Sequence, residues 1–182
     1  MDVMSADRTI REVRAEDWPA AKELRLAALR DPLAPLAFME TYERAEARPD
    51  AAWRERTVSS AAGGPNRQFV AEVTEGPGTA LVGTVTVLLE EPGTEDFLGG
   101  RVEHRQAHLV AVFVRPEHRG GGLAAGLFRA AVGWARGQRG VCRVRLFVHV
   151  DNGRAQAFYR KAGFVQVGVV GDEYEMEYRA ER

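Results

Sequence analysis

The sequence predicts an α+β fold in which a mixed, strongly twisted sheet is flanked by helices. Three observations lead to this expectation. Helical periodicity dominates residues 18–60, β-branched and aliphatic residues become frequent after residue 66, and two later helical segments alternate with strands. The order is therefore helices first, then strands with two late helices packed on the sheet.

The first third of the chain is predicted to form a short strand and three helices. Asp17 precedes Trp18 and Pro19, a pattern typical of a helix N-terminus. This helix should end at Asp31-Pro32, because a residue that precedes proline disfavours the helical region. The expected strand spans 9–13, the later helices span 39–47 and 51–60, and an irregular connection with two prolines spans 32–38.

The rest of the chain reads as strands interrupted by two helices. Gly76-Pro77-Gly78 is a hairpin signal, so the strands on either side should pair antiparallel. The strongly apolar segment 108–114 is typical of a central strand covered on both faces, and 90–100, rich in glycine and proline, reads as a mobile loop. The expected strands are 69–73, 81–89, 108–114, 141–150, 164–169 and 173–178, and the helices are 123–137 and 153–162.

Length and charge restrict the class of protein. The 182 residues suit one domain spanning 1–182, without internal repeats. A net charge of -1 disfavours a nucleic-acid partner, and no apolar run is long enough to suggest a membrane partner. Cys142 is the only cysteine, which rules out an intrachain disulfide; we expect it to be a buried apolar residue and expect no metal site. A polar, acidic start and this cysteine usage fit a cytoplasmic protein.

The clearest chemical signal is a strand at 112–114 that leads through a glycine turn into a helix. Free N–H groups at a helix N-terminus and the helix dipole bind anions. Gly120, Gly121 and Gly122 would let the backbone approach a diphosphate, and Arg119 could add a charged hydrogen bond. A glycine turn that only permits tight packing would have the same residues. The glycine patterns of dinucleotide-binding and ATP-binding loops do not occur here.

This segment resembles the pyrophosphate-binding signature of the GNAT superfamily of acyl-CoA N-acyltransferases. That signature, Gln/Arg-x-x-Gly-x-Gly/Ala after a strand, is matched by Arg119 to Ala124. A second segment, 151–164, is similar to the family's later motif, in which an asparagine and an alanine lead a helix with an aromatic pair and a Gly-Phe turn. The resemblance covers about residues 68–170 and, more loosely, 24–53.

The resemblance implies a GNAT-like acyl-CoA N-acyltransferase fold, with acetyl-CoA as cosubstrate between two diverging strands. Val112 and Val114 would bind the pantetheine amides through their backbone, and a backbone N–H near Val114 would stabilise the developing oxyanion. The cofactor-binding residues implied are Val112, Phe113, Val114, Arg119, Gly120, Gly121, Gly122, Leu123, Ala124, Asn152, Ala155 and Tyr159. Asn152 also fits a helix cap, and the two roles are compatible.

The resemblance also implies catalytic roles. Tyr159 would be the general acid that protonates the departing thiolate, although a packed aromatic would fit the same position. His108, upstream on the same strand as Val112, is the best candidate for the base. Glu103 and His104 are alternative candidates for the base. Each of the three residues could instead be a solvated strand-edge or loop residue. Bulk water could then accept the proton from the amine.

We therefore expect an acetyl group to pass from acetyl-CoA directly to a small primary amine, an amino acid or an N-terminal amine. Phe38, Met39 and Tyr42, with Pro35, are expected to line the acceptor pocket, unless they only pack a short helix. The alternative function is a non-catalytic acyl-CoA-binding sensor. The expected partner is a small-molecule or peptide amine, and a homodimer is left open.

Overall fold

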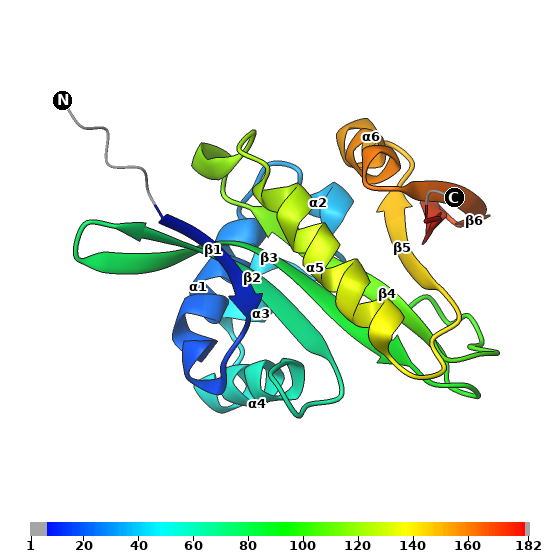
Figure 1. Ribbon diagram of the computed structural model, residues 1–182, viewed down its shortest axis with the longest axis horizontal. Helices are drawn as coiled ribbons and strands as arrows, with labels where there is room; N and C mark the ends of the chain where they lie inside the picture. The colour runs from blue at the N-terminus through cyan, green and yellow to red at the C-terminus, as the bar shows by residue number, and fades with distance from the viewer. Residues whose placement is uncertain (1–6, 181–182) are drawn as a thin grey trace.

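A seven-stranded sheet forms the centre of the computed structural model, which describes residues 7–180 (Figure 1). The strands are β1 (Asp7–Glu12), β2 (Arg67–Glu75), β3 (Gly78–Glu90), β4 (Gln106–Val114), β5 (Val144–His149), β6 (Phe164–Val170) and β7 (Glu173–Tyr178). The helices are α1 (Trp18–Leu29), α2 (Ala34–Ala37), α3 (Tyr42–Glu46), α4 (Asp50–Ser60), α5 (Leu123–Gly137) and α6 (Gly153–Lys161), with 3-10 turns η1 (Ala15–Asp17) and η2 (Pro116–His118). Within residues 7–180, none of the helices has the length and apolar character needed to cross a membrane.

The sheet is mixed, as predicted. Its strand order is β1-β2-β3-β4-β5-β7-β6. The pairing of β4 with β5 is parallel, and each of the other neighbouring pairs is antiparallel. The predicted hairpin of β2 and β3 is present, with Phe69 opposite Val85. The α+β prediction is therefore confirmed.

Helices cover both faces of β2, β3 and β4 (Figure 1). On one face, α5 buries Leu127 and Ala131 in the largest apolar core, where they meet strand residues such as Val85. On the other face, Leu24 of α1 packs in a second core with Phe113 of β4. This covering confirms the prediction that 108–114 is a central strand with both faces buried.

Several local predictions need correction. Residues 32–38 are not wholly irregular, because α2 forms one turn there with Pro35 near its N-terminus, where proline needs no hydrogen-bond donor. Asp17 lies at the predicted N-cap of α1, but its carboxylate accepts from the Arg14 N–H at 2.7 Å. Cys142 is exposed rather than buried, because β5 begins only at Val144 and leaves it in the preceding turn.

Candidate active site

The two central parallel strands separate soon after they meet. The register of β4 with β5 covers only the pairs Ala107 with Val144 and His108 with Arg145. Beyond these pairs lies a cavity of about 540 Å³, a volume typical of small-molecule sites. The end of β4, the start of α5, the residues around α2 and one side of α6 line it. This is the divergence of two strands that the sequence predicted for a cofactor site.

A one-residue bulge changes which side chains of β4 face each layer. Ala111 has a φ of 54°, a conformation uncommon for a residue with a side chain, and the register with β3 shifts at this point. Before the bulge Ala107 and Leu109 pack in the core beneath α5, whereas after it Val112 and Val114 do so. An extra residue inverts the alternation of a strand, so the bulge sets the orientation of the predicted cofactor-binding residues.

The backbone of Val114 points into the gap between the strands. The Arg115 N–H donates to Val82 O on β3 at 2.8 Å. Because successive amides of a strand point to opposite edges, the Val114 N–H faces away from β3, and that of Val112 follows the same alternation. The Val114 carbonyl also points away from β3, because it accepts a hydrogen bond from Arg119 Nε at 2.8 Å. Two amides of β4 are therefore directed at the cavity.

The glycine turn leads directly into the N-terminus of α5. Gly120 and Gly122 both have a φ of 82°, the left-handed region that favours glycine, and Gly122 is the N-cap of α5. A Cβ added to either glycine would find none of the atoms of residues 7–180 within 4 Å, so the turn is open at these two positions. Gly121 differs, because an added Cβ would meet the Arg8 guanidinium, and it does not line the cavity. The first N–H groups of α5 and its dipole suit a diphosphate there.

Three side chains with basic groups also lie around this cavity: His118, which the sequence suggested as a surface residue or phosphate neighbour, and Arg154 and Lys161, whose roles were not predicted. Arg154 and Lys161 lie at opposite ends of α6, and their spacing of seven residues puts both on one helix face. That spacing, combined with the motif at 151–164, was the signal that could have identified them.

Arg119 lies at the cavity, but its guanidinium already has two protein partners. Its Nη2 donates to Asp31 Oδ2 at 2.7 Å and its Nε to the Val114 carbonyl. Burial raises the pKa of Asp31, but the hydrogen bonds from Arg119 and the Leu33 N–H, together with the charges of Arg119 and Arg154, hold the pKa below its usual range. Asp31 also lines the cavity, whereas sequence analysis had treated it only as a helix end.

Asn152 and Ala155 connect the cavity to the start of α6. The Asn152 Oδ1 accepts from the Ala155 N–H at 3.2 Å, which confirms the predicted helix cap. Asn152 is buried and, with Ala155, lines the cavity. The cap therefore fixes the first turn of the helix that carries Tyr159.

Tyr159 lines the same cavity and is held by aromatic neighbours. Its ring stacks on Phe128 of α5 at 5.5 Å between centroids, and Phe158 lies edge-on to it at 5.7 Å. Burial, with a smaller effect from Glu173, raises the pKa of Tyr159 to about 12. The phenol is therefore protonated at neutral pH and can act as a donor.

His108 is enclosed, so the prediction of a solvated position is wrong for this residue. It is 1% exposed and lies between Phe97, which stacks on it at 4.8 Å, and Phe147, which is edge-on at 5.4 Å. Its Nδ1 is 3.6 Å from Glu90 Oε2 and has no hydrogen-bond partner in the part of the chain that the structure describes. The rivals Glu103 and His104 are both exposed, as expected for solvated residues.

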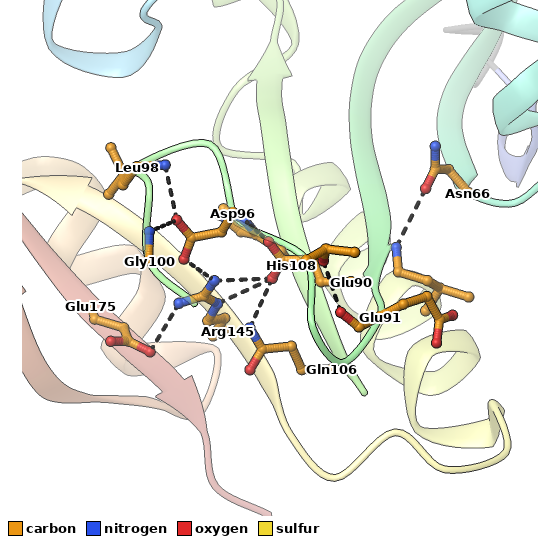
Figure 2. A network of polar contacts seen from close by, with 12 residues as sticks. Asn66, Glu90, Glu91, Asp96, Leu98, Gly100, Gln106, His108, Arg145 and Glu175 are labelled. Atoms are coloured by element: carbon orange, nitrogen blue, oxygen red, sulfur yellow. Dashed lines mark hydrogen bonds and ion pairs between the residues drawn. The ribbon is translucent and has the colours of Figure 1, made fainter. Parts of the chain in front are cut away.

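A buried ionic network surrounds His108 (Figure 2). Arg145 donates to Asp96 at 2.6 Å and to Glu90 at 3.0 Å, and its Nη1 donates to Glu175 at 3.3 Å. Asp96 also accepts from the N–H groups of Leu98 and Gly100 within its own loop. Its bond to Arg145 attaches the 90–100 loop, predicted to be mobile, to β5. Burial raises the pKa of Glu90, but His108 and Arg145 lower it overall.

The predicted acceptor residues do not all meet at the cavity. Phe38 lines it, but Met39 is 69% exposed and Tyr42 instead hydrogen-bonds Glu46 at 2.8 Å. Pro35 is also exposed. The turn of α2 directs Ala34 and Ala37 toward the cavity, since residues three apart share a helix face.

Comparisons with known proteins agree with this geometry. Residues 18–164 match the model of the acetyltransferase (GNAT) family. No curated protein matched the chain. A PaiA N-acetyltransferase from Thermoplasma acidophilum in complex with coenzyme A has a TM-score of 0.72 and 19% identity, over 96% of this chain and 99% of that one.

Two further solved structures have the same fold. An acetyltransferase of the GNAT family from Streptococcus pneumoniae has a TM-score of 0.73 and 18% identity, over 94% of this chain and 98% of that one. The NAA60 protein of Arabidopsis thaliana in complex with acetyl-CoA has a TM-score of 0.64 and 18% identity, over 94% of this chain and 96% of that one. The family match covers most of the sequence, and the chain therefore belongs to the acetyltransferase (GNAT) family, whose members are acyl-CoA-dependent acetyltransferases.

Proposed function

We propose that the protein transfers an acetyl group from acetyl-CoA directly to an amine, with Tyr159 as the general acid. The observation that carries this proposal is the convergence on one cavity of three groups: the glycine turn before α5, the free edge of β4, and Tyr159. Solved neighbours that hold coenzyme A or acetyl-CoA support the choice of cosubstrate.

The cavity suits each part of acetyl-CoA. The diphosphate would lie against the N-terminus of α5, where the glycine backbone leaves room for it. The pantetheine amides would extend the sheet beside β4, bonded to the backbone of Val112 and Val114. Arg154 and Lys161 would provide charge for the phosphates, and Arg119 would do so from its anchored position.

The proposed reaction needs no covalent bond to the enzyme. The neutral amine nitrogen attacks the thioester carbonyl carbon, the carbon–sulfur bond breaks, and the sulfur leaves with the bonding electrons. Tyr159 donates its phenolic proton to that sulfur and is reprotonated from solvent. A backbone N–H near Val114 stabilises the negative charge that develops on the carbonyl oxygen. The raised pKa keeps the Tyr159 phenol protonated but makes it a weaker acid, whereas burial would make the departing thiolate more basic and so favour its protonation.

The proton that the amine loses would pass to His108. His108 lies on β4 four residues before Val112, and its Nδ1 lies near the Glu90 carboxylate, which would stabilise the imidazolium. The ring of Phe97 now covers it, so the amine would reach His108 only if Phe97 moved or through a water molecule. Direct transfer to bulk water remains the competing route.

Two measurements test this function. Calorimetry with acetyl-CoA tests the cavity, and release of free CoA in the presence of a panel of amines tests the transfer. Solved neighbours include a spermidine N-acetyltransferase chimera and a NatC complex bound to Gag peptide and CoA, so the panel should contain polyamines, amino acids and peptides. Saturable acetyl-CoA binding without CoA release from any amine would favour the non-catalytic sensor instead.

A further inference from the structure

A second cavity, of about 260 Å³, lies on the face of the sheet opposite α5. The helices α1 and α4 form its roof, and β2, β3 and β4 form its floor. The floor is polar for a covered sheet face: Gln68, Thr84 and Thr86 line it, and Gln68 Nε2 donates to Thr84 Oγ1 at 2.9 Å. Polar side chains in the floor of a partly covered cavity are suited to a polar ligand rather than to packing alone.

Two buried polar atoms on residues that line this cavity have no hydrogen-bond partner among residues 7–180. Trp53 is only 2% exposed, and its indole Nε1 has no hydrogen-bond acceptor. The Arg25 side chain is 14% exposed, and its Nη1 likewise has no acceptor. Indole and guanidinium groups can donate but cannot accept hydrogen bonds. A ligand that satisfies both must therefore supply acceptor oxygens.

The charge around the cavity also favours an anion. Arg25, Arg48 and Arg56 all form ion pairs with a single carboxylate, Glu40. Three guanidinium groups against one carboxylate leave a surplus of two positive charges, and Arg25 and Arg56 line the cavity. Burial lowers the pKa of both arginines, and repulsion from Arg25 lowers that of Arg56 further. A bound anion would relieve this repulsion.

The second cavity adjoins the proposed site of transfer. It is lined by Val110 and Ala111, the residues of β4 immediately before Val112, which lines the larger cavity. The Arg25 guanidinium lies 4.5 Å from the ring centroid of Phe38, which also lines the larger cavity. Leu88 lines the smaller cavity and pairs with His108. A short molecule could thus place one end near Arg25 and the other near the thioester.

We propose that the smaller cavity binds a carboxylate of the acceptor through Arg25, Arg56 and Trp53, so that the acetylated substrate is a small amine that carries a carboxylate, such as a free amino acid. This proposal rests on the acetyl transfer proposed above and specifies its substrate class. A polyamine is disfavoured because it would bring further positive charge to the arginines. A peptide N-terminus is disfavoured because its neighbouring carbonyl is a neutral amide.

Matched sets of amines test the charge directly. Each amino acid is compared with its carboxamide and with the amine formed by its decarboxylation, and kcat/KM is measured from CoA release. Hydrogen bonds to a charged group predict that the free carboxylate raises kcat/KM by about 10- to 100-fold over either analogue. A polyamine, a short peptide and an amine with a phosphonate in place of the carboxylate complete the panel.

Variants of the arginines test whether the preference for a free carboxylate arises in the smaller cavity. Arg56→Gln should reduce the preference for the carboxylate by about 10-fold or more, and Arg56→Lys should restore part of it. Arg25→Gln should act in the same direction, and its unfolding midpoint shows whether the fold is retained. Arg54→Gln is the matched control, because Arg54 lies on the same helix but over the ring of Trp18 and outside the cavity.

The outcomes separate this proposal from the general function. A carboxylate preference that Arg56→Gln removes and Arg54→Gln retains supports the site. If the carboxamide, the polyamine or the peptide is turned over as well as the free carboxylate or better, the carboxylate site is overturned, but the proposed N-acetyltransferase function still holds. A preference for the phosphonate has the same meaning. Acetyl-CoA binding without turnover of any amine overturns the transfer function together with this substrate class.

Discussion

The carboxylate of Asp31 anchors the guanidinium of Arg119 at the edge of the larger cavity, with Nη2 and Oδ2 2.7 Å apart. The partners are 88 residues apart in sequence and join the end of α1 to the turn before α5. The pair fixes Arg119 in place, yet it also brings a negative charge to a cavity proposed to hold phosphates. These two effects oppose each other in cofactor binding.

The substitution Asp31→Asn separates the two effects. The side-chain amide of this variant would keep an acceptor for Arg119 but remove the charge, so we expect acetyl-CoA to bind about 3- to 10-fold more tightly at low salt. The gain should shrink in concentrated salt, where charges are screened. Calorimetric titration at two ionic strengths measures this. Weaker binding at both would show instead that the anchoring of Arg119 matters more than the repulsion.

Removing the Tyr159 hydroxyl should slow transfer without loosening the cosubstrate. Tyr159→Phe keeps the stack on Phe128, so the dissociation constant of acetyl-CoA should change by less than about 2-fold while kcat falls by about 100-fold or more. Tyr178→Phe is the control, since Tyr178 packs on Phe164 and does not line the cavity. Unchanged kcat in Tyr159→Phe would assign this residue a packing role only.

A side chain at Gly122 should interfere with the ligand rather than with the protein. The Cβ in Gly122→Ala meets no protein atom, although the left-handed φ costs about 1 to 2 kcal/mol of stability. We expect acetyl-CoA affinity to fall about 10-fold or more, because the glycine backbone would no longer approach the diphosphate. Gly133→Ala, on the exposed middle of α5, should retain affinity and add stability. Equal affinities for the two variants would argue against a phosphate site at this turn.

Local patterns in the sequence predicted much of this fold because local physics determines it. The apolar stripe of α5, with Leu127 and Ala131 at helical spacing, is buried as expected. In the glycine turn, Gly120 and Gly122 have the left-handed geometry that favours glycine. Each of these features depends on neighbours within a few residues, which a single sequence displays directly.

Features set by distant contacts could not be predicted in the same way. The bulge at Ala111 carries no glycine to mark it, yet it decides which β4 side chains face α5. The positions of Met39 and Tyr42 depend on how the short α2 packs, and this cannot be read from periodicity over a single turn. Burial of His108 requires Phe97, from a loop whose composition suggested mobility but which Asp96 attaches to Arg145.

The stability of the network around Arg145 should depend strongly on pH (Figure 2). Burial raises the pKa of Asp96, but the hydrogen bonds from Arg145, Gly100 and Leu98 and the charge of Arg145 together lower it overall, and the pKa of Glu90 is lowered as well. A carboxyl whose pKa is depressed in the folded state stabilises the protein above its unfolded pKa of about 4, and this contribution is lost as the pH falls below that value. The pH dependence from Tyr159 has the opposite sign. Its pKa is raised in the folded state, so its contribution to the free energy of unfolding is lost as the pH rises above the unfolded pKa of about 10.

Arg145→Met tests the acid side of this dependence. At neutral pH the variant leaves buried carboxylates without their cation, so the free energy of unfolding should fall by about 3 to 5 kcal/mol. Protonation removes the unpaired charges, so the difference from the parent protein should narrow as the pH approaches 4. Urea denaturation between pH 4 and pH 8 measures both curves, with Arg129→Met on the exposed side of α5 as control. A difference that stays constant over this range would mean that Arg145 stabilises the fold through packing of its side chain rather than through its charge.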